Sequence, residues 1–196
     1  MSGLPDALPP TFTTKAARQL GVHPRSLYAW RDAGEVVELS RGVFRRGDAP
    51  PATYPDLLAV ALRAPRGIMC CLSAAVVHDL TDELAPNVDL AMPNDCWVPR
   101  VDHPPTRVFR FAPTTFTLGL DQVEAAPGES VPVYDAARTV VDLIRLRHRL
   151  GETIAYRALN RYWDSPGARP RLLVEYAQAL GALSAVRAAI DVVGAR

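Results

Sequence analysis

Lysine and cysteine are both scarce in this 196-residue chain. Lys15 is the only lysine, although lysine and arginine together number 22. The three cysteines, Cys70, Cys71 and Cys96, do not have the spacing of a metal site and cannot all pair with one another. We therefore expect reduced thiols in a cytoplasmic protein, and neither a metal nor another cofactor. Such a preference for arginine usually reflects a GC-rich genome more than function, although arginine also suits phosphate recognition.

The chain also lacks a long hydrophobic run. The longest extends from about Ile68 to Val77, is interrupted by Ser73, and has about half the length that a membrane span requires. The first residues include Asp6 and prolines but no basic start, so they do not resemble a secretory signal. A content of 48% hydrophobic and 22% charged residues is ordinary for a globular protein, and we expect no membrane association.

Residues 13 to 34 have the pattern of two short helices joined by a tight turn. Thr13 and Thr14 are suited to cap the first helix, because a threonine oxygen accepts an orphan amide at a helix start. Gly21 is suited to end it, and Pro24 suits the first turn of the second helix. Leu27 and Trp30 lie three residues apart and should pack inward. The segment therefore predicts a helix-turn-helix.

A short β-hairpin should follow directly. Val36–Leu39 and Val43–Arg45 flank the turn Ser40-Arg41-Gly42, which places an arginine at the tip. Between Thr14 and Arg46 there are seven basic and three acidic residues, a net charge of +4 in a chain of net charge +1, so the remainder carries −3. Clustered cations favour binding to DNA, because they release counterions from its phosphates. The order of helix, turn, helix and hairpin, together with this charge, therefore predicts a winged helix-turn-helix that binds DNA.

The expected DNA contacts come from both helices and the hairpin. They are Thr14, Lys15, Arg18, His23, Arg25, Ser26, Tyr28, Arg31, Arg41 and Arg45. Arg25 and Ser26 lie near the start of the second helix, where base edges are usually read, and arginine can bond guanine with two donors. Arg41 could enter the minor groove. Two alternatives stay open: His23 has either a phosphate or a turn role, and Trp30 either packs in the core or stacks on a base.

The rest of the chain should form a mixed α/β region with a helical end. We expect a linker over residues 47 to 55, a helix over Tyr54–Arg63, and a second helix that Ser73 caps. Further expected elements are strands at Val88–Met92 and Val108–Phe111, a hairpin through Pro127-Gly128, and helices from Asp135 onward. The predicted fold class is thus α+β, with a winged helix-turn-helix over residues 1–50 and an α/β domain over residues 51–196.

These blocks, in this order, resemble the AbiEi family of antitoxins over roughly residues 12 to 165. The match rests on LGVHPRSLYAWRDAGEVVELSRGVFRR, PDLLAVALRAPRGIMCCLSAAVVHDLTDELAPNVDLAMP, DHPPTRVFRF and VPVYDAARTVVDLIRLRHRLG. The resemblance implies an antitoxin whose first domain represses its own promoter by binding inverted repeats in double-stranded DNA. It also implies that the second domain counteracts a nucleotidyltransferase-like toxin. The family would lead us to expect a lysine where Arg138 stands.

The C-terminal helices offer candidates for the surface that faces the toxin, namely Arg138, Asp142, Arg145 and Arg147. Arg138 and Asp142 lie four residues apart on one expected helix, so they could instead form a local ion pair. The basic stretch that continues through His148, Arg149, Arg157 and Arg161 could hold DNA or an acidic toxin surface, or could be a solvated helix face.

Two other functions stay open beside the antitoxin. One is an antitoxin that modifies the toxin as an atypical kinase, although the chain has no phosphate-binding or kinase motif and we expect no enzyme. The other is a plain winged-helix regulator. A hydrolase built on Ser73 and His78 is disfavoured, because five residues rotate a helix by about 140° and the two side chains do not face each other. An inverted repeat requires two copies, as a dimer or as monomers that meet on DNA.

Overall fold

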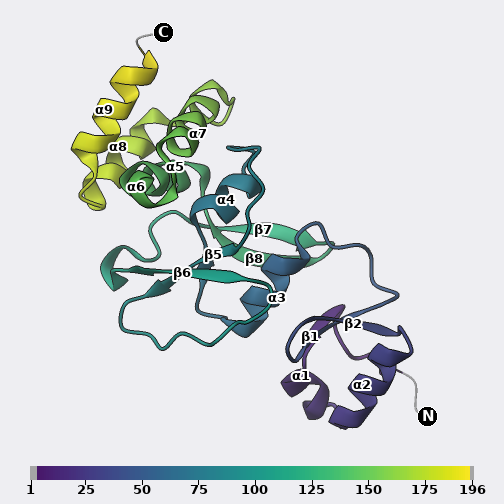
Figure 1. Cartoon of the computed structure of the whole chain (residues 1–196). Helices are drawn as coiled ribbons and strands as arrows, with labels where there is room; N and C mark the ends of the chain where they lie inside the picture. Colours follow the sequence, from purple (N-terminus) through teal and green to yellow (C-terminus); the bar gives the residue numbers. More distant parts are fainter. Residues whose placement is uncertain (1–3, 195–196) are drawn as a thin grey trace. The chain divides into compact units, whose positions relative to one another are not determined.

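The computed structural model describes residues 4–194 (Figure 1). Its α-helices are α1 (Thr14–Gln19), α2 (Pro24–Asp32), α3 (Pro55–Arg63), α4 (Cys71–Val77), α5 (Ala136–Arg145), α6 (Arg147–Leu150), α7 (Glu152–Asp164), α8 (Pro170–Ala179) and α9 (Leu183–Gly194). Its strands are β1 (Thr11–Thr13), β2 (Val36–Ser40), β3 (Val43–Arg46), β4 (Ile68–Met69), β5 (Val88–Pro93), β6 (Thr106–Phe111), β7 (Leu120–Ala126) and β8 (Glu129–Tyr134). Within residues 4–194, no helix is long and apolar enough to cross a membrane.

The chain divides into two compact units. The first consists of the chain through Arg66 with two later segments, Val98–Thr106 and Glu124–Val131. The second consists of Gly67–Trp97, Arg107–Val123 and the chain from Pro132 onward. The first unit therefore extends beyond residue 50, where the sequence placed its end, because α3 packs on the strands of the winged helix.

The first unit is built on a small antiparallel sheet in the order β1-β3-β2. Phe12 on β1 lies opposite Phe44 on β3, and the centroids of their rings are 6.0 Å apart. Leu27 and Trp30 of α2 are buried in the same core, as their spacing predicts. The packing role of Trp30 is therefore confirmed, and the helix-turn-helix rests on a sheet whose first strand, β1, the sequence pattern did not reveal.

Local signals set the ends of the two short helices as predicted. The Thr13 side chain accepts a hydrogen bond from the Ala16 amide at 3.1 Å and so caps α1. His23 caps α2 in the same way, because its Nδ1 accepts from the Arg25 amide at 3.1 Å. Gly21 follows α1 with a φ of 78°, a left-handed conformation that glycine adopts without strain. The turn role of His23 is thus observed.

The second unit combines most of a five-stranded sheet with a helical group; the segment Glu124–Val131, where β7 and β8 meet, belongs to the first unit. The strand order is β6-β5-β4-β8-β7, with β4 antiparallel to β5 and parallel to β8. Helix α5 is the centre of the helical group, because α4, α7, α8 and α9 all pack against it (Figure 1). Every residue from Ala137 to Ile144 is buried, so α5 has no solvated face along this length. The mixed α+β class with a helical end is confirmed.

Helix α4 differs from the expectation at its start. It begins at Cys71 and not at Ser73, so Ser73 lies inside the helix and does not cap it. The Ser73 hydroxyl instead accepts a hydrogen bond from the Asp89 amide at 2.8 Å, which ties α4 to β5. His78 ends the helix and lies 2.7 Å from the Tyr134 carbonyl oxygen through its Nε2. Both side chains are therefore engaged separately in holding the second unit together.

Gly119, in the turn before β7, makes a close approach that should be sensitive to substitution. Its φ is 72°, and an added Cβ would lie 2.7 Å from the Cβ of Arg138. Gly181 is a matched control, because its φ is 66° and an added Cβ would meet nothing within 4 Å. Gly181→Ala should lower the free energy of unfolding by about 1–2 kcal/mol, because alanine is strained in a left-handed backbone conformation. Gly119→Ala should cost about 1–3 kcal/mol more for overpacking, measured as the free energy of unfolding in urea; equal losses would contradict the close approach.

Candidate nucleic-acid interface

The start of α1 is hydrogen-bonded to the tip of the β2–β3 wing. The Thr14 amide donates to the Gly42 carbonyl at 2.9 Å, and the Thr14 hydroxyl donates to the same oxygen at 3.3 Å. The Gly42 amide in turn donates to the Glu38 carboxylate at 3.1 Å. Thr14 is half-buried by these contacts, so it positions the wing. The exposed side chains of Lys15 and Arg41 are brought together by this contact.

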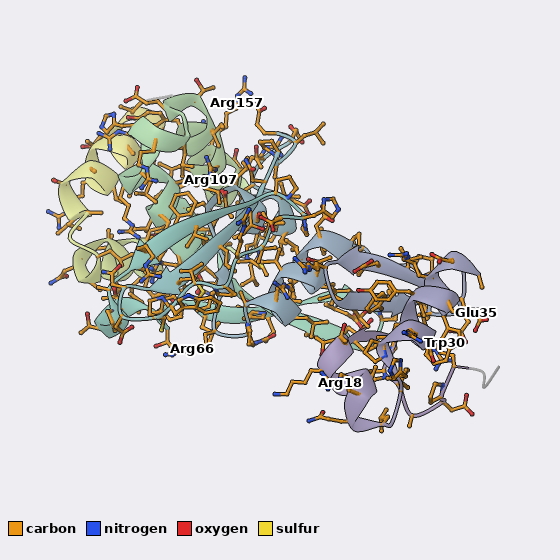
Figure 2. The ribbon with its side chains drawn as sticks, turned by 60° about the horizontal axis from the view of Figure 1, so that its bottom comes forward. Arg18, Trp30, Glu35, Arg66, Arg107 and Arg157 are labelled. Atoms are coloured by element: carbon orange, nitrogen blue, oxygen red, sulfur yellow. The ribbon has the colours of Figure 1, made fainter. Side chains whose placement is uncertain are left out.

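Helix α2 presents Arg25 and Tyr28 to solvent, and Ser26 is partly exposed. Arg25 and Tyr28 are three residues apart, so they lie on neighbouring positions of one helix side. On α1, Arg18 is exposed and lies on the outer side of the helix (Figure 2). The exposed cations Lys15, Arg18, Arg25 and Arg41 are thus free of the core of the first unit.

Arg31 is exposed but already bound to protein carboxylates. It donates to Asp32 at 2.9 Å and to Glu38 at 3.1 Å, and these hydrogen bonds raise the pKa of its guanidinium. Its guanidinium carbon also lies 5.0 Å from the centroid of the Tyr28 ring. A phosphate contact by Arg31 would therefore compete with two carboxylates.

Arg45 does not lie on the surface that the sequence predicted. Its side chain is 8% exposed and forms an ion pair with Glu129, on the tip of the β7–β8 hairpin. It also donates to the Thr11 hydroxyl and, at 2.6 Å, to the Pro50 carbonyl. We therefore correct the expectation of a DNA contact by Arg45: burial and these partners give it a structural role within the first unit.

A cationic groove of about 520 Å³ lies beside the wing tip. It is lined by Thr13, Thr14, Lys15, Tyr28, Ser40, Arg41, Gly42, Val43, Leu62, Arg63, Arg100 and Asp102. Four of the expected DNA contacts, Thr14, Lys15, Tyr28 and Arg41, therefore meet in one place. Arg63 and Arg100 were missed by sequence reasoning, because Arg100 comes from a proline-rich loop with no local signal of its position.

Arg138 and Asp142 are fully buried in the second unit, with side chains 0% exposed. Arg138 donates to Asp142 at 3.0 Å and to the carbonyls of Thr115 and Leu118 at 3.0 and 2.8 Å. Burial raises the pKa of Asp142, and the charges of Arg138 and Arg145 oppose that shift. We therefore correct the expectation that Arg138 and Asp142 face the toxin: the pair holds α5 to the loop before β7.

The neighbouring arginines are more accessible. Arg145 donates to Asp142 at 2.7 Å and Arg147 donates to the Ile144 carbonyl at 3.0 Å, while their side chains stay 23% and 24% exposed. Arg149 is exposed and lies over the Phe109 ring at 5.3 Å. Arg161, by contrast, forms an ion pair with Asp82. Arg147 also lies 3.7 Å from the Glu152 carboxylate and Arg157 lies 3.6 Å from that of Glu83. Among the arginines from Arg145 to Arg161, Arg149 is therefore the one that is exposed and has no carboxylate partner among the described residues.

The adjacent thiols of Cys70 and Cys71 are both buried in the hydrophobic core of the second unit. Burial raises the pKa of each thiol. Both cysteines therefore stay protonated at neutral pH and pack as small side chains.

The geometry of the first unit defines a winged helix-turn-helix, and comparison with known proteins agrees. Residues 7–47 match the model of a family described as "Transcriptional regulator, AbiEi antitoxin". This match confirms, for the N-terminal segment, the resemblance to AbiEi antitoxins that the sequence predicted. A search of curated proteins found no match.

The fold of nearly the whole chain has a counterpart among solved structures. The crystal structure of the RV2827C protein from Mycobacterium tuberculosis superposes with a TM-score of 0.67 at 16% sequence identity. The alignment covers 93% of this chain and 72% of that chain. At this identity the likeness shows a shared fold.

The buried pair can be tested against an exposed pair of the same spacing. Arg171 and Glu175 on α8 are also four residues apart, but their side chains are 91% and 48% exposed. Asp142→Asn should lower the free energy of unfolding by about 3–5 kcal/mol, because it leaves the buried Arg138 without a counter-charge. Glu175→Gln should cost less than about 1 kcal/mol. Urea denaturation of both variants makes the comparison; a small loss for Asp142→Asn would show that the pair is not required.

Proposed function

We propose that the protein is an antitoxin that also represses its own operon. The first unit binds inverted repeats in the operon promoter, and the second unit counteracts a nucleotidyltransferase-like toxin encoded beside it. The protein acts by binding and makes no chemical change in either partner. The single observation that carries this proposal is the winged helix of residues 7–47, which combines the family match with exposed cations on its two helices and its wing.

The DNA-binding half of the proposal follows from the placement of charge. Lys15 and Arg18 on α1 are suited to phosphates, Arg25 at the start of α2 to a base edge, and Arg41 on the wing to the backbone or minor groove. His23 caps the start of α2, and Thr14 holds the wing to α1 through its hydrogen bonds to Gly42. Ser26 and Tyr28 lie on α2, the helix proposed to enter the major groove. An inverted repeat would take one copy of the chain on each half-site.

The toxin-binding half is supported by charge that stays exposed on the second unit. Arg149 is exposed on α6. The partly exposed Arg145, at the end of α5, and Arg147, at the start of α6, stand close to it in the chain, although each has a carboxylate partner. A surface of this kind would recognise an acidic face of the toxin through electrostatic complementarity.

Arg25 should contribute both affinity and base preference. Arg25→Ala should weaken binding to a fragment from upstream of the coding sequence by about 1–3 kcal/mol and relax the preference at one base pair. Arg18→Ala should instead weaken binding to that fragment and to a mixed-sequence duplex equally, because a phosphate contact carries no sequence information. Fluorescence anisotropy on both DNAs measures the difference. Equal losses for Arg25→Ala on the two DNAs would refute its reading role.

Repression and protection should be separable. When co-expressed with the product of the neighbouring gene, the Arg25→Ala variant should lose promoter repression in a reporter assay and still restore growth. The double variant Arg147→Glu, Arg149→Glu should lose growth rescue and co-purification, since it reverses the basic surface. Arg171→Glu is the control, because Arg171 is an exposed helix arginine in the same unit. Rescue by the double variant would place the toxin contact elsewhere.

A further inference from the structure

The cationic groove contains more positive charge than the helix-turn-helix itself supplies. Lys15 comes from α1 and Arg41 from the wing, but Arg63 comes from the end of α3 and Arg100 from the loop Val98–Thr106. Asp102 is the only acidic residue among those that line the groove, so its formal charge is four minus one, or +3. Four separate segments of the first unit thus each contribute one cation to the groove.

Two hydrogen bonds join the loop that carries Arg100 to neighbouring elements, and a third lies within the loop. The buried Ser40 hydroxyl, at the end of β2, donates to the His103 carbonyl. Arg63 donates from Nη2 to the Arg100 carbonyl at 3.0 Å, and Thr106 donates from its hydroxyl to the Pro104 carbonyl at 2.9 Å. The loop is therefore held to both the wing and α3, and it forms one side of the groove.

The groove also retains unused hydrogen-bond donors. The Nε of Arg63 is buried and does not face the groove. The hydrogen bonds of the two arginines use the Nη2 of Arg63 and the Nε of Arg100, so the Nη1 of Arg63 and the Nη groups of Arg100 have no partner among the described residues. Arg100 is paired with Asp102 at 2.6 Å, but their side chains are 87% and 64% exposed, so water and salt screen the pair. Fixed guanidinium groups with free donors are the usual ligands of phosphate oxygens.

We infer that Arg63 and Arg100 bind a phosphate of the DNA backbone beside the wing, outside the contacts made by α2. The ligand of this groove is DNA and not a free small anion, because the groove is also lined by Tyr28 of α2 and Arg41 of the wing, two elements of the winged helix-turn-helix. A duplex whose major groove receives α2 would therefore pass its backbone along these cations. This inference rests on the proposed DNA-binding function and extends its surface to chain segments outside residues 7–47.

The test is a salt titration of the full chain on two duplexes, one from upstream of the coding sequence and one of mixed sequence. Arg100→Gln should reduce the slope of log K against log salt by about 0.9 per bound chain on both duplexes, as the loss of one phosphate contact requires. Asp102→Asn should tighten binding to both, because it removes the groove's carboxylate. Arg66→Gln is the matched control: Arg66 is an exposed cation of the same unit that does not line the groove.

Phosphate ethylation interference locates the contact. Ethylation of one backbone position should weaken wild-type binding and have no further effect on Arg100→Gln. Unchanged binding by Arg100→Gln and Asp102→Asn, together with a loss for Arg25→Ala, would overturn this inference and leave the proposed function standing. If the wild-type chain shows no salt-sensitive binding to either duplex, the inference and the DNA-binding proposal both fail.

Discussion

The proposed DNA-facing surface depends on the hydrogen bonds between Thr14 and the Gly42 carbonyl. They join the first turn of α1 to the wing tip, two places that lie 28 residues apart in the chain. Gly42 has a φ of 76°, and an added Cβ would lie 3.1 Å from the Thr14 hydroxyl oxygen. The left-handed backbone therefore favours glycine at residue 42, and the Thr14 hydroxyl adds a second hydrogen bond to the one made by its amide. Without these hydrogen bonds the positions of Lys15 and Arg41 would be independent, and fixed spacing is what a rigid phosphate backbone demands.

The number of cations in a segment overstates the number available to a ligand. Of the seven basic residues between Thr14 and Arg46, three are engaged by carboxylates, namely Arg31 with Asp32 and Glu38, Arg45 with Glu129, and Arg46 with Asp48. The groove regains charge from Arg63 and Arg100, which are distant in sequence. The net charge of the segment therefore includes arginines that are already paired, and it leaves out Arg63 and Arg100, which line the groove.

Local chemistry made much of the fold predictable. Caps, glycine turns and the spacing of Leu27 and Trp30 define α1, α2 and the wing, because each signal acts within a few residues. Long-range contacts were not predictable from such signals. Strand β1 exists through its pairing with β3, α3 joins the first unit by packing on that sheet, and the burial of Arg45 depends on Glu129.

Arg138 shows why a charged pair on a helix does not by itself mark a binding surface. Its guanidinium satisfies one carboxylate and two carbonyls while it lies 4.3 Å from the centroid of the Tyr134 ring. A lysine, which the family resemblance would place here, has a compact ammonium that cannot present this planar fork of donors and stack on the ring at once. Arginine therefore suits the buried site. Because α5 is enclosed along its length, contacts with a partner must come from residues beyond its core, such as Arg147 and Arg149.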